Sequence, residues 1–588
     1  MGVRNYTMLG KLKFFLLTAT LLCGVACSDN STEGGENNNQ GSGNNNQQTD
    51  TGVLNGTTIE KGNTVYGLIT DSVTGNGIAG VAVTDGTHLV KTDNNGVYQI
   101  PTNRWAKYVW FTIPANYQVP VDPQNGRPIF YSTSRILVGQ QNRNDWKLTP
   151  LPAVEDEFTI VAIGDPQCEV ASEAERFRAE TIADIRSTIS SAQTADNRYH
   201  NAYAITLGDI TFDNTALWPT MAQLCSSVEL NNGKKIPIFN CIGNHDHDAD
   251  RQDDSAATEL YVQNVGPTDY SFDRGKVHFV VMDNILCTTV SGSGSSKTWN
   301  YNAGYTSTQI SWLEKDLEAV EDKANKMVVL CSHIPFRGGS TSGGSNVNKD
   351  RGYAEVLKLL TQFNEAHIFI GHTHYPENYQ HSSYKTKNGQ PIFEHVHGAA
   401  CGGWWTSNIG VEGSPNGYSI YEVKGATMHN WVAKGTKMKE SDQMRVYNGN
   451  DTYGHKYVYS WTSGGTGGSG NIKTSGNSGL ANCFIATIWN DDLPNWEVEL
   501  IVDGVSHRMQ RVSYNLADMC ATAFFFNEKG KNTTTWNKGM KHSWYVKAPC
   551  GDPSQEKNWT VKATHTVKGS GKQNVYTASG FTTSYNGF

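Results

Sequence analysis

Residues 203–213 read YAITLGDITFD, a run of β-forming residues followed at once by a polar turn that carries two aspartates. Four more polar blocks surround it in the chain: GDPQ from Gly164, GNHD from Gly243, SHIPF from Ser332 and GHTH from Gly371. Most of these also follow β-forming runs, namely FTIVAI, IPIFNCI, MVVLC and AHIFI. Active sites of open α/β sheets lie at the carboxyl ends of the strands, so we expect the five blocks to converge there. Their Asp, Asn and His side chains are oxygen and nitrogen ligands, which predicts a centre of one or two metal ions.

The five blocks resemble the motif set of the calcineurin-like metallophosphoesterases, in which D-x-H, GDxxxD, GNHD, a lone His after a strand and GHxH follow in order. The matching residues are Asp165, Asp209 with Asp213, Asn244-His245-Asp246, His333, and His372 with His374. One departure is Gln167, which stands where the family has its first histidine. An amide oxygen can bind a metal ion but is neutral and usually a weaker ligand than imidazole, so the identity and affinity of that first metal stay open.

The resemblance implies an enzyme, a hydrolase acting on phosphoester bonds with two metal ions that Asp209 bridges. One ion would be bound by Asp165, Gln167, Asp209 and His374, and the other by Asp209, Asn244, His333 and His372. Such ligands suit Mn²⁺, Fe or Zn²⁺. A metal-bridging hydroxide would attack phosphorus, His245 would protonate the leaving oxygen, and Asp246 would orient His245. For Asp213, a structural hydrogen bond is at least as good an interpretation as a catalytic role.

Substrate contacts are expected in the loops that follow the metal-bearing strands. Arg337, just past SHIPF, could pair with a phosphate oxygen, although an exposed salt bridge is an equally good interpretation. The other candidates are Tyr375, His397, Trp404 and Trp405, and the two tryptophans are as open to a packing role. His247 and Asp248, after GNHD, are expected to lie in a solvated loop.

Three functions stay open at this point. The first is a phosphoesterase that acts on a phosphomonoester or phosphodiester, whose substrate is a phosphorylated small molecule, nucleotide, sugar or lipid. The second is a pyrophosphatase or phospholipid-directed enzyme of the same fold. The third is a catalytically silent, glycan-binding envelope protein with a vestigial metal site. The nearly complete ligand set favours an enzyme.

Composition excludes some functions. The formal net charge of −8 over 588 residues gives no electrostatic case for nucleic-acid binding, and that length is too great for one hydrophobic core. Nine cysteines follow Cys27, an odd number. No CxxC pair occurs, which argues against a structural zinc site. The oligomeric state is not readable from the sequence.

The N-terminus predicts export. Basic residues precede an apolar run, Phe14 to Ala26, that is too short to span a bilayer but suits a signal peptide. The run ends in GVAC, and a polar stretch follows Cys27, as in bacterial lipoproteins, although Gly24 stands where Leu is usual. The resemblance implies that Cys27 is lipidated and anchors the protein to a membrane of the bacterial cell envelope, outside the cytoplasm. The alternatives are a periplasmic or secreted protein.

We expect five segments and an α/β fold. They are a signal peptide (1–27), a flexible linker (28–60), a β-sandwich accessory domain (61–150), the metallophosphoesterase domain (155–425) and a C-terminal β-rich domain (426–588). The accessory segment resembles carboxypeptidase-regulatory-like β-sandwiches, and the last segment resembles domains found behind exported phosphoesterases. The family fold implied for the central domain is a β-sheet sandwich flanked by helices. Apolar residues at a helical spacing predict helices over 175–192, 309–320 and 353–363.

Overall fold

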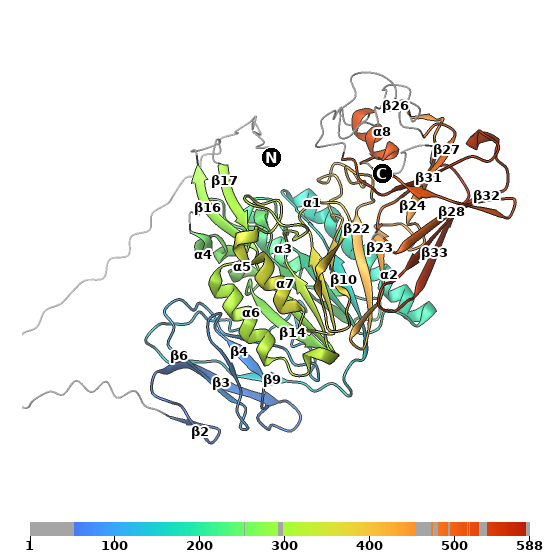
Figure 1. Ribbon diagram of the computed structural model, residues 1–588. Helices are drawn as coiled ribbons and strands as arrows, with labels where there is room; N and C mark the ends of the chain where they lie inside the picture. The colour runs from blue at the N-terminus through green and yellow to red at the C-terminus, as the bar shows by residue number, and fades with distance from the viewer. Residues whose placement is uncertain are drawn as a thin grey trace, which may run out of the picture.

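The computed structural model describes residues 52–583, except for 252, 292–297, 454–471, 474–479, 492–493, 514, 517 and 528–537. The predicted signal peptide, the lipidation site at Cys27 and most of the linker therefore lie outside the described residues. The described chain forms a central unit with a β-rich unit on either side (Figure 1). Within the described part, no helix is both long and apolar enough to cross a membrane.

The first sheet of the central unit has six strands and carries three of the polar blocks. Its order is β12 (Ser227–Glu229), β13 (Lys235–Cys241), β11 (Ala202–Leu207), β10 (Glu157–Ile163), β22 (Gly417–Lys424) and β23 (Thr427–Gly435). Strands β10, β11 and β13 run parallel, so their carboxyl ends meet at one edge. Strand β23 completes this sheet by pairing with β22, so the boundary predicted after residue 425 cuts through a hairpin of the central unit.

The second sheet also has six strands and carries the other two blocks. Its order is β14 (Tyr270–Arg274), β15 (Val277–Val281), β18 (Met327–Cys331), β19 (Glu365–Ile370), β21 (Pro391–Val396) and β20 (Glu377–Lys385). Strands β15, β18, β19 and β21 are parallel, which places the ends of β18 and β19 side by side.

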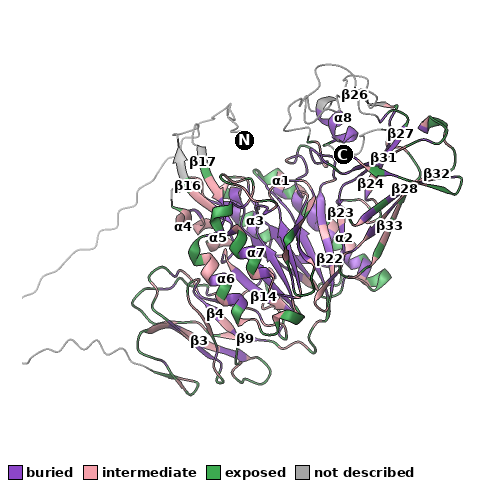
Figure 2. Ribbon diagram, viewed as in Figure 1, coloured by how far each residue is buried: buried purple, intermediate pink, exposed green. Residues whose placement is uncertain are grey.

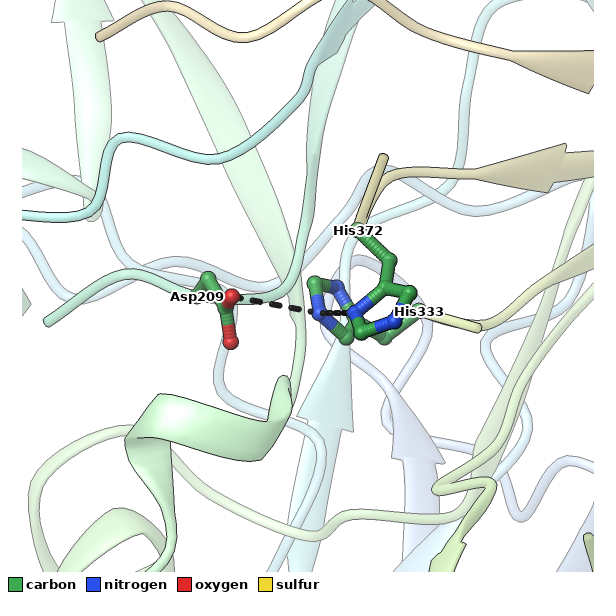
Figure 3. A group of neighbouring side chains, drawn as sticks. All are labelled: Asp209, His333 and His372. Atoms are coloured by element: carbon green, nitrogen blue, oxygen red, sulfur yellow. Dashed lines mark hydrogen bonds and ion pairs between the residues drawn. The ribbon is translucent and has the colours of Figure 1, made fainter. Parts of the chain in front are cut away.

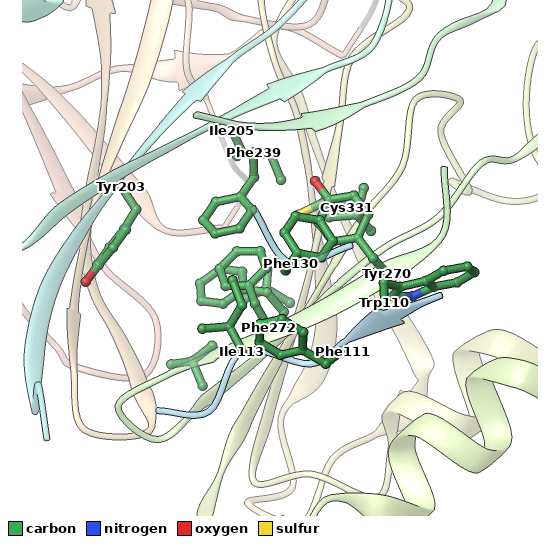
Figure 4. Packing of buried hydrophobic residues seen from close by; sticks show 14 of the residues in the cluster. Trp110, Phe111, Ile113, Phe130, Tyr203, Ile205, Phe239, Tyr270, Phe272 and Cys331 are labelled. Atoms are coloured by element: carbon green, nitrogen blue, oxygen red, sulfur yellow. The ribbon is translucent and has the colours of Figure 1, made fainter. Parts of the chain in front are cut away.

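The two sheets pack face to face through large apolar side chains (Figure 4). Phe272 stacks on Phe239 of the opposite sheet with ring centroids 3.8 Å apart, and on Phe279 at 4.7 Å. Burying a phenylalanine contributes about 1.5–3 kcal/mol relative to exposure. These rings therefore hold the two strand-end edges in a fixed mutual position.

Helices cover the outer faces of both sheets, and their inward sides are buried while the outward sides are exposed (Figure 2). The helices are α1 (Ala171–Arg176), α2 (Ala183–Ser191), α3 (Trp218–Leu224), α4 (Asp254–Ala257), α5 (Glu259–Asn264), α6 (Ser307–Ala319) and α7 (Ala354–Leu360). Helix α6 begins at a capping box formed by Thr306 and Gln309 and buries Leu313 and Leu317, as its spacing predicts. This is the sandwich flanked by helices that the family resemblance implies.

The N-terminal unit is a small β-structure whose core continues into the sandwich. Its strands are β1 (Val53–Leu54), β2 (Thr57–Thr58), β3 (Asn63–Asp71), β4 (Ala82–Thr84), β5 (Leu89–Lys91), β6 (Val97–Pro101), β7 (Trp110–Phe111), β8 (Asn142–Arg143) and β9 (Trp146–Leu148). Ile113 forms a β-bridge with Phe272, and Arg274 donates a hydrogen bond to the Tyr117 carbonyl at 2.8 Å. The unit is thus attached on the side of the sandwich that carries β14.

The C-terminal unit contains two four-stranded sheets, ordered β24-β27-β31-β30 and β29-β28-β32-β33. Their bounds are β24 (Met444–Asn448), β27 (Cys483–Ile488), β28 (Trp496–Val502), β29 (Val505–Arg508), β30 (Gln510–Arg511), β31 (Ser543–Lys547), β32 (Trp559–Thr566) and β33 (Gln573–Ala578). Helix α8 (Met519–Asn527) and the pair β25 (Thr452–Tyr453) and β26 (Ile472–Lys473) complete it. Ile409 and Val411, from the loop between β21 and β22, belong to the same apolar cluster as α8.

A β-hairpin projects from the central unit beside the polar edge. It consists of β16 (Ile285–Ser291) and β17 (Thr298–Ala303), and its register shifts between Cys287 and Thr289. Such bulges change the direction in which strand side chains point. The hairpin lies next to α4 (Figure 1).

Candidate metal centre

The five polar blocks meet at the common edge of the two sheets. Asp165 follows β10, Asp209 follows β11, Asn244 follows β13, His333 follows β18 and His372 follows β19. Four residues of these turns, Asp165, Asp209, His372 and His374, have φ between 42° and 69°. Asp, Asn and His tolerate this left-handed conformation better than most residues, which is one reason why such types suit these turns.

Glycines in the blocks allow the loops to approach closely. A Cβ on Gly243 would lie 2.0 Å from the Asp209 amide nitrogen, and a Cβ on Gly208 would lie 2.5 Å from His333 Nδ1. Gly208 also has a φ of 86°. Any side chain at either position would therefore displace a candidate ligand.

Asp209 belongs to two groups of candidate ligands. One oxygen of its carboxylate lies 3.3 Å from His333 Nε2, and His372 completes a group whose ligand atoms lie within 4.8 Å of one another (Figure 3). Asp209 also forms a second group with Asp165 and His374, whose ligand atoms likewise lie within 4.8 Å of one another. A carboxylate shared in this way is the arrangement expected of a ligand that bridges two ions.

The group around His333 has its lone pairs directed inward. His333 Nδ1 lies 2.7 Å from the Leu207 carbonyl and must donate to it, so Nε2 is the nitrogen that a metal ion would bind in place of a proton. Asn244 Oδ1 lies 3.1 Å from that Nε2 and 2.9 Å from His372 Nδ1. Burial lowers the pKa of His372 to about 3, so this imidazole is neutral, as a metal ligand must be.

The second group shows a corresponding need for a cation. His374 Nδ1 is buried and has no hydrogen-bond partner, and burial lowers the pKa of this ring to about 4. Asp165 is fully buried, and burial raises the pKa of its carboxyl to about 8, with the charge of Asp209 adding to the effect. A divalent cation would stabilise both carboxylates in their ionised form. The residues present therefore fit two metal ions.

Gln167 lies within reach of this second group. Its backbone N–H donates to the Asp209 carbonyl at 2.6 Å, and its side-chain Nε2 lies 3.1 Å from Asp209 Oδ2. A half-turn of the amide exchanges Nε2 for Oε1 without moving the rest of the side chain. The position that the sequence assigns to a ligand is thus next to the shared carboxylate.

His245 stands at the mouth of the centre, with 27% of its side chain exposed. Its Nδ1 lies 2.9 Å from Asp213 Oδ1, and its ring stacks on Phe212 with centroids 4.3 Å apart. Burial alone would lower the pKa of His245, but the charge of Asp209 and the hydrogen bond that the ring donates to Asp213 raise it to about 9. The ring is therefore held in one orientation by its two neighbours from the GDITFD block.

The prediction that Asp246 orients His245 is wrong. The Asp246 carboxylate accepts hydrogen bonds from the backbone N–H groups of Gly243, Ile210 and Thr211 at 2.9, 3.1 and 2.8 Å. It thus ties the GNHD turn to the GDITFD turn. Asp213 is the carboxylate that contacts the ring, because a residue adjacent in sequence to His245 points its side chain elsewhere in a tight turn.

Two of the predicted substrate contacts lie beside the ligands. The ring of Trp404 is 4.9 Å from that of His374. Tyr375 lies between two cations, with Arg337 5.8 Å and Lys538 5.1 Å from its ring centroid. Arg337 itself pairs with Glu377 at 2.5 Å, which corresponds to the salt-bridge interpretation, although only 20% of its side chain is exposed.

The structure corrects two other expectations, for His397 and His247, and favours the packing interpretation of Trp405. His397 is buried in the sandwich, where Nδ1 contacts the Ile370 carbonyl and Nε2 the Tyr421 hydroxyl, so both nitrogens are engaged. Trp405 is buried and donates its indole N–H to the Pro166 carbonyl at 2.9 Å, and this hydrogen bond stabilises the GDPQ turn. His247 is also buried and does not lie in a solvated loop.

Sequence reasoning missed Tyr301, which the β16–β17 hairpin brings to the centre. The carboxylates of Asp209 and Asp213 add to the effect of burial in raising the pKa of its hydroxyl. No local motif marks this tyrosine, because it comes from a strand far from the polar blocks in the chain. Lys538 was missed for the same reason.

Comparisons with known proteins give three family matches in order along the chain. Residues 63–151 match "N terminal of Calcineurin-like phosphoesterase", residues 158–376 match "Calcineurin-like phosphoesterase", and residues 394–569 match "C terminal of Calcineurin-like phosphoesterase". These matches confirm the predicted family and the predicted order of its parts. No curated protein matches the chain. A solved structure, the NAD nucleotidase of Haemophilus influenzae, aligns over 48% of this chain and 49% of its own, at 14% identity and a TM-score of 0.25.

Proposed function

We infer that this chain, which belongs to the calcineurin-like phosphoesterase family, hydrolyses phosphoester bonds at the edge where the two sheets meet. The observation that carries the proposal is the carboxylate of Asp209, which is shared by two compact groups of buried ligands. One group adds His333, His372 and the amide oxygen of Asn244, and the other adds Asp165 and His374. Gln167 would complete the second group through its amide oxygen.

Divalent ions bound there would polarise a phosphoryl oxygen and lower the pKa of a water molecule. The ligand types suit Mn²⁺, Fe or Zn²⁺. Asp246 keeps the two ligand-bearing turns in register through the three backbone N–H groups that it accepts. The positions of Asp209 and Asn244 are thereby coupled.

His245 is the group placed to donate a proton to the leaving oxygen. Its Nδ1 is engaged by Asp213, so Nε2 is the ring nitrogen that can face a substrate. Trp404 and Tyr375 lie beside His374. Their rings would contact the organic group of the substrate, which either leaves with the alcohol or stays on the phosphate. We propose a phosphomonoester or phosphodiester as substrate.

The test combines metal analysis with hydrolysis of an aryl phosphate monoester and an aryl phosphate diester in the presence of Mn²⁺. We expect Asp209→Asn to lose bound metal and turnover, and His245→Ala to keep metal and lose turnover. Asp196→Asn and His200→Ala, which lie outside the centre, serve as matched controls and should behave like the wild type. Less than about one ion per chain together with no hydrolysis of either ester would refute the proposal.

We also propose that the chain is exported and anchored through lipid at Cys27. Support comes from the sequence alone, namely the short apolar run and the GVAC sequence. Cys27→Ser should move the protein from the membrane fraction to the soluble envelope fraction, whereas Cys550→Ser should not. Finding both variants in the membrane fraction would rule out this anchor.

A further inference from the structure

A second, separate cluster of ligand side chains lies where α4 meets the β16–β17 hairpin. His247, Asp254 and Cys287 each place a ligand atom within 4.8 Å of those of the other two. None of the three belongs to the two groups that share Asp209. We propose that they bind a third divalent cation, of the zinc type, which stabilises the structure rather than acting on substrate.

The orientation of His247 suits this role. Its Nδ1 lies 2.9 Å from the Gly243 carbonyl and donates to it, so Nε2 is the ring nitrogen that an ion can bind in place of a proton. A backbone carbonyl that fixes the tautomer of a histidine is a common device in metal sites. Asp283 Oδ2 lies 3.2 Å from the same Nε2 and orients the ring beside the cluster.

Asp254 is oriented by the chain that carries Cys287. One oxygen of its carboxylate, Oδ1, accepts a hydrogen bond from the Cys287 backbone N–H at 2.6 Å. The other oxygen is left for an ion that also contacts the Cys287 sulfur. Tetrahedral zinc sites have ligand atoms about 3.3–3.8 Å apart, given bond lengths of about 2.0–2.3 Å, so a contraction of roughly 1 Å would form the site.

The cluster can carry more negative charge than one protonated histidine neutralises. Burial raises the pKa of Asp254, and the charge of Asp283 adds to it. Two carboxylates and a thiol around one imidazole are a set that a borderline cation neutralises, and a soft sulfur ligand favours Zn²⁺ over Mg²⁺ or Ca²⁺. The absence of a CxxC pair does not exclude this site, because only one of its ligands is a cysteine and it comes from a different segment than His247 and Asp254.

The ion would connect two parts of the candidate active site, the GNHD turn and the β16–β17 hairpin. His247 follows the GNHD turn, whereas Cys287 lies in β16 and is paired with Tyr301 of β17. A bond from each to the same ion would fix the hairpin, and with it Tyr301, relative to the turn that carries Asn244 and His245. The register of the hairpin shifts directly after Cys287, at this junction.

Cobalt binding tests the proposal independently of the dinuclear centre. The metal-free full chain is titrated with Co²⁺, and the near-ultraviolet band of a thiolate-to-cobalt charge transfer is recorded. We expect the band in the wild type and in Asp209→Asn, and its loss in Cys287→Ser. Cys401→Ser and Cys550→Ser are matched controls, the first because Cys401 lies near Gln167, and both should keep the band.

Zinc affinity supplies a second readout. Asp254→Asn and Cys287→Ser should weaken one Zn²⁺ site by at least about tenfold and lower the stoichiometry by one ion, while the ions bound through Asp209 stay. A band that persists in Cys287→Ser, or that disappears in Cys401→Ser instead, would overturn the proposal. So would an unchanged zinc stoichiometry in both variants. Failure of the dinuclear centre would show differently, as a metal content that is the same in Asp209→Asn as in the wild type, with the cobalt band still present in both.

Discussion

Replacing Asp213 by asparagine tests whether His245 is held in place for catalysis by the neighbouring turn. The change keeps the shape of the side chain but removes its charge from the 2.9 Å contact with His245 Nδ1. Hydrogen bonds to charged groups contribute about 1.5–3 kcal/mol. Asp213 is 49% exposed, and water weakens such a contact, so we expect a loss at the lower end.

A loss of about 1.4 kcal/mol in the transition state corresponds to a tenfold decrease in kcat. KM should change little, because Asp213 is remote from the ligands that would hold the phosphate. Bound metal and melting temperature should match those of the wild type. The assay is steady-state hydrolysis of an aryl phosphate with Mn²⁺, with metal content and thermal unfolding measured on the same preparations.

A double-mutant cycle tests whether Asp213→Asn lowers kcat because His245 is no longer held in place or for an unrelated reason. In the His245→Ala background, Asp213→Asn should have no further effect on kcat, because the group that it positions is gone. Phe212, which stacks on the same ring, provides a second contact that limits the loss. Unchanged kcat in Asp213→Asn, additive losses in the double variant, or loss of metal in Asp213→Asn would each refute the reasoning.

Three further predictions concern the turns and the second sheet. Asp246→Asn should lower the melting temperature and the metal content together, since it weakens three buried backbone hydrogen bonds between two ligand-bearing turns; normal metal content would contradict this. Gln167→His should tighten the weaker of the two Mn²⁺ sites by about tenfold in a metal titration, since imidazole is the better ligand. His278 contacts carboxylates of Asp273 and Asp316 at 2.7 and 2.8 Å; burial lowers its pKa, but these charges raise it to about 10. Its stabilisation is therefore complete below about pH 6.5 and is lost as the pH rises toward 10, so His278→Gln should cost about 3 kcal/mol at pH 6 and less at pH 10 in denaturant unfolding.

The candidate ligands could be predicted because each lies directly after a strand in the chain. Strand ends of a parallel sheet meet at one edge, so a local pattern was enough to bring Asp165, Asp209 and His333 together. The partner of His245 could not be predicted in this way. Adjacent residues of a tight turn point in different directions, and the choice between Asp213 and Asp246 depends on backbone angles that the motif does not encode.

Burial explains the other differences between sequence and structure. His397 directly follows β21, and its side chain is buried in the sandwich, where an alternating pattern does not distinguish a core histidine from one at a cleft. Tyr301 comes from a hairpin, and Lys538, which contacts Tyr375, comes from a C-terminal loop, so only the tertiary fold brings them near the centre. The predicted domain boundary falls in the turn of the β22–β23 hairpin, because β23, which follows it in the chain, pairs within the central sheet.

The left-handed turns that carry Asp165, Asp209, His372 and His374 have an evolutionary consequence. Each such residue costs on the order of 1 kcal/mol relative to glycine, which adopts this conformation freely. Mutations toward glycine would therefore relax the fold while erasing the ligands, and unfolding of the metal-free protein should show Asp165→Gly to be more stable than Asp165→Ala. Under selection for stability alone, substitutions to glycine at these four positions would be favoured, and the ligands would be lost. Selection for metal binding is therefore needed to keep them.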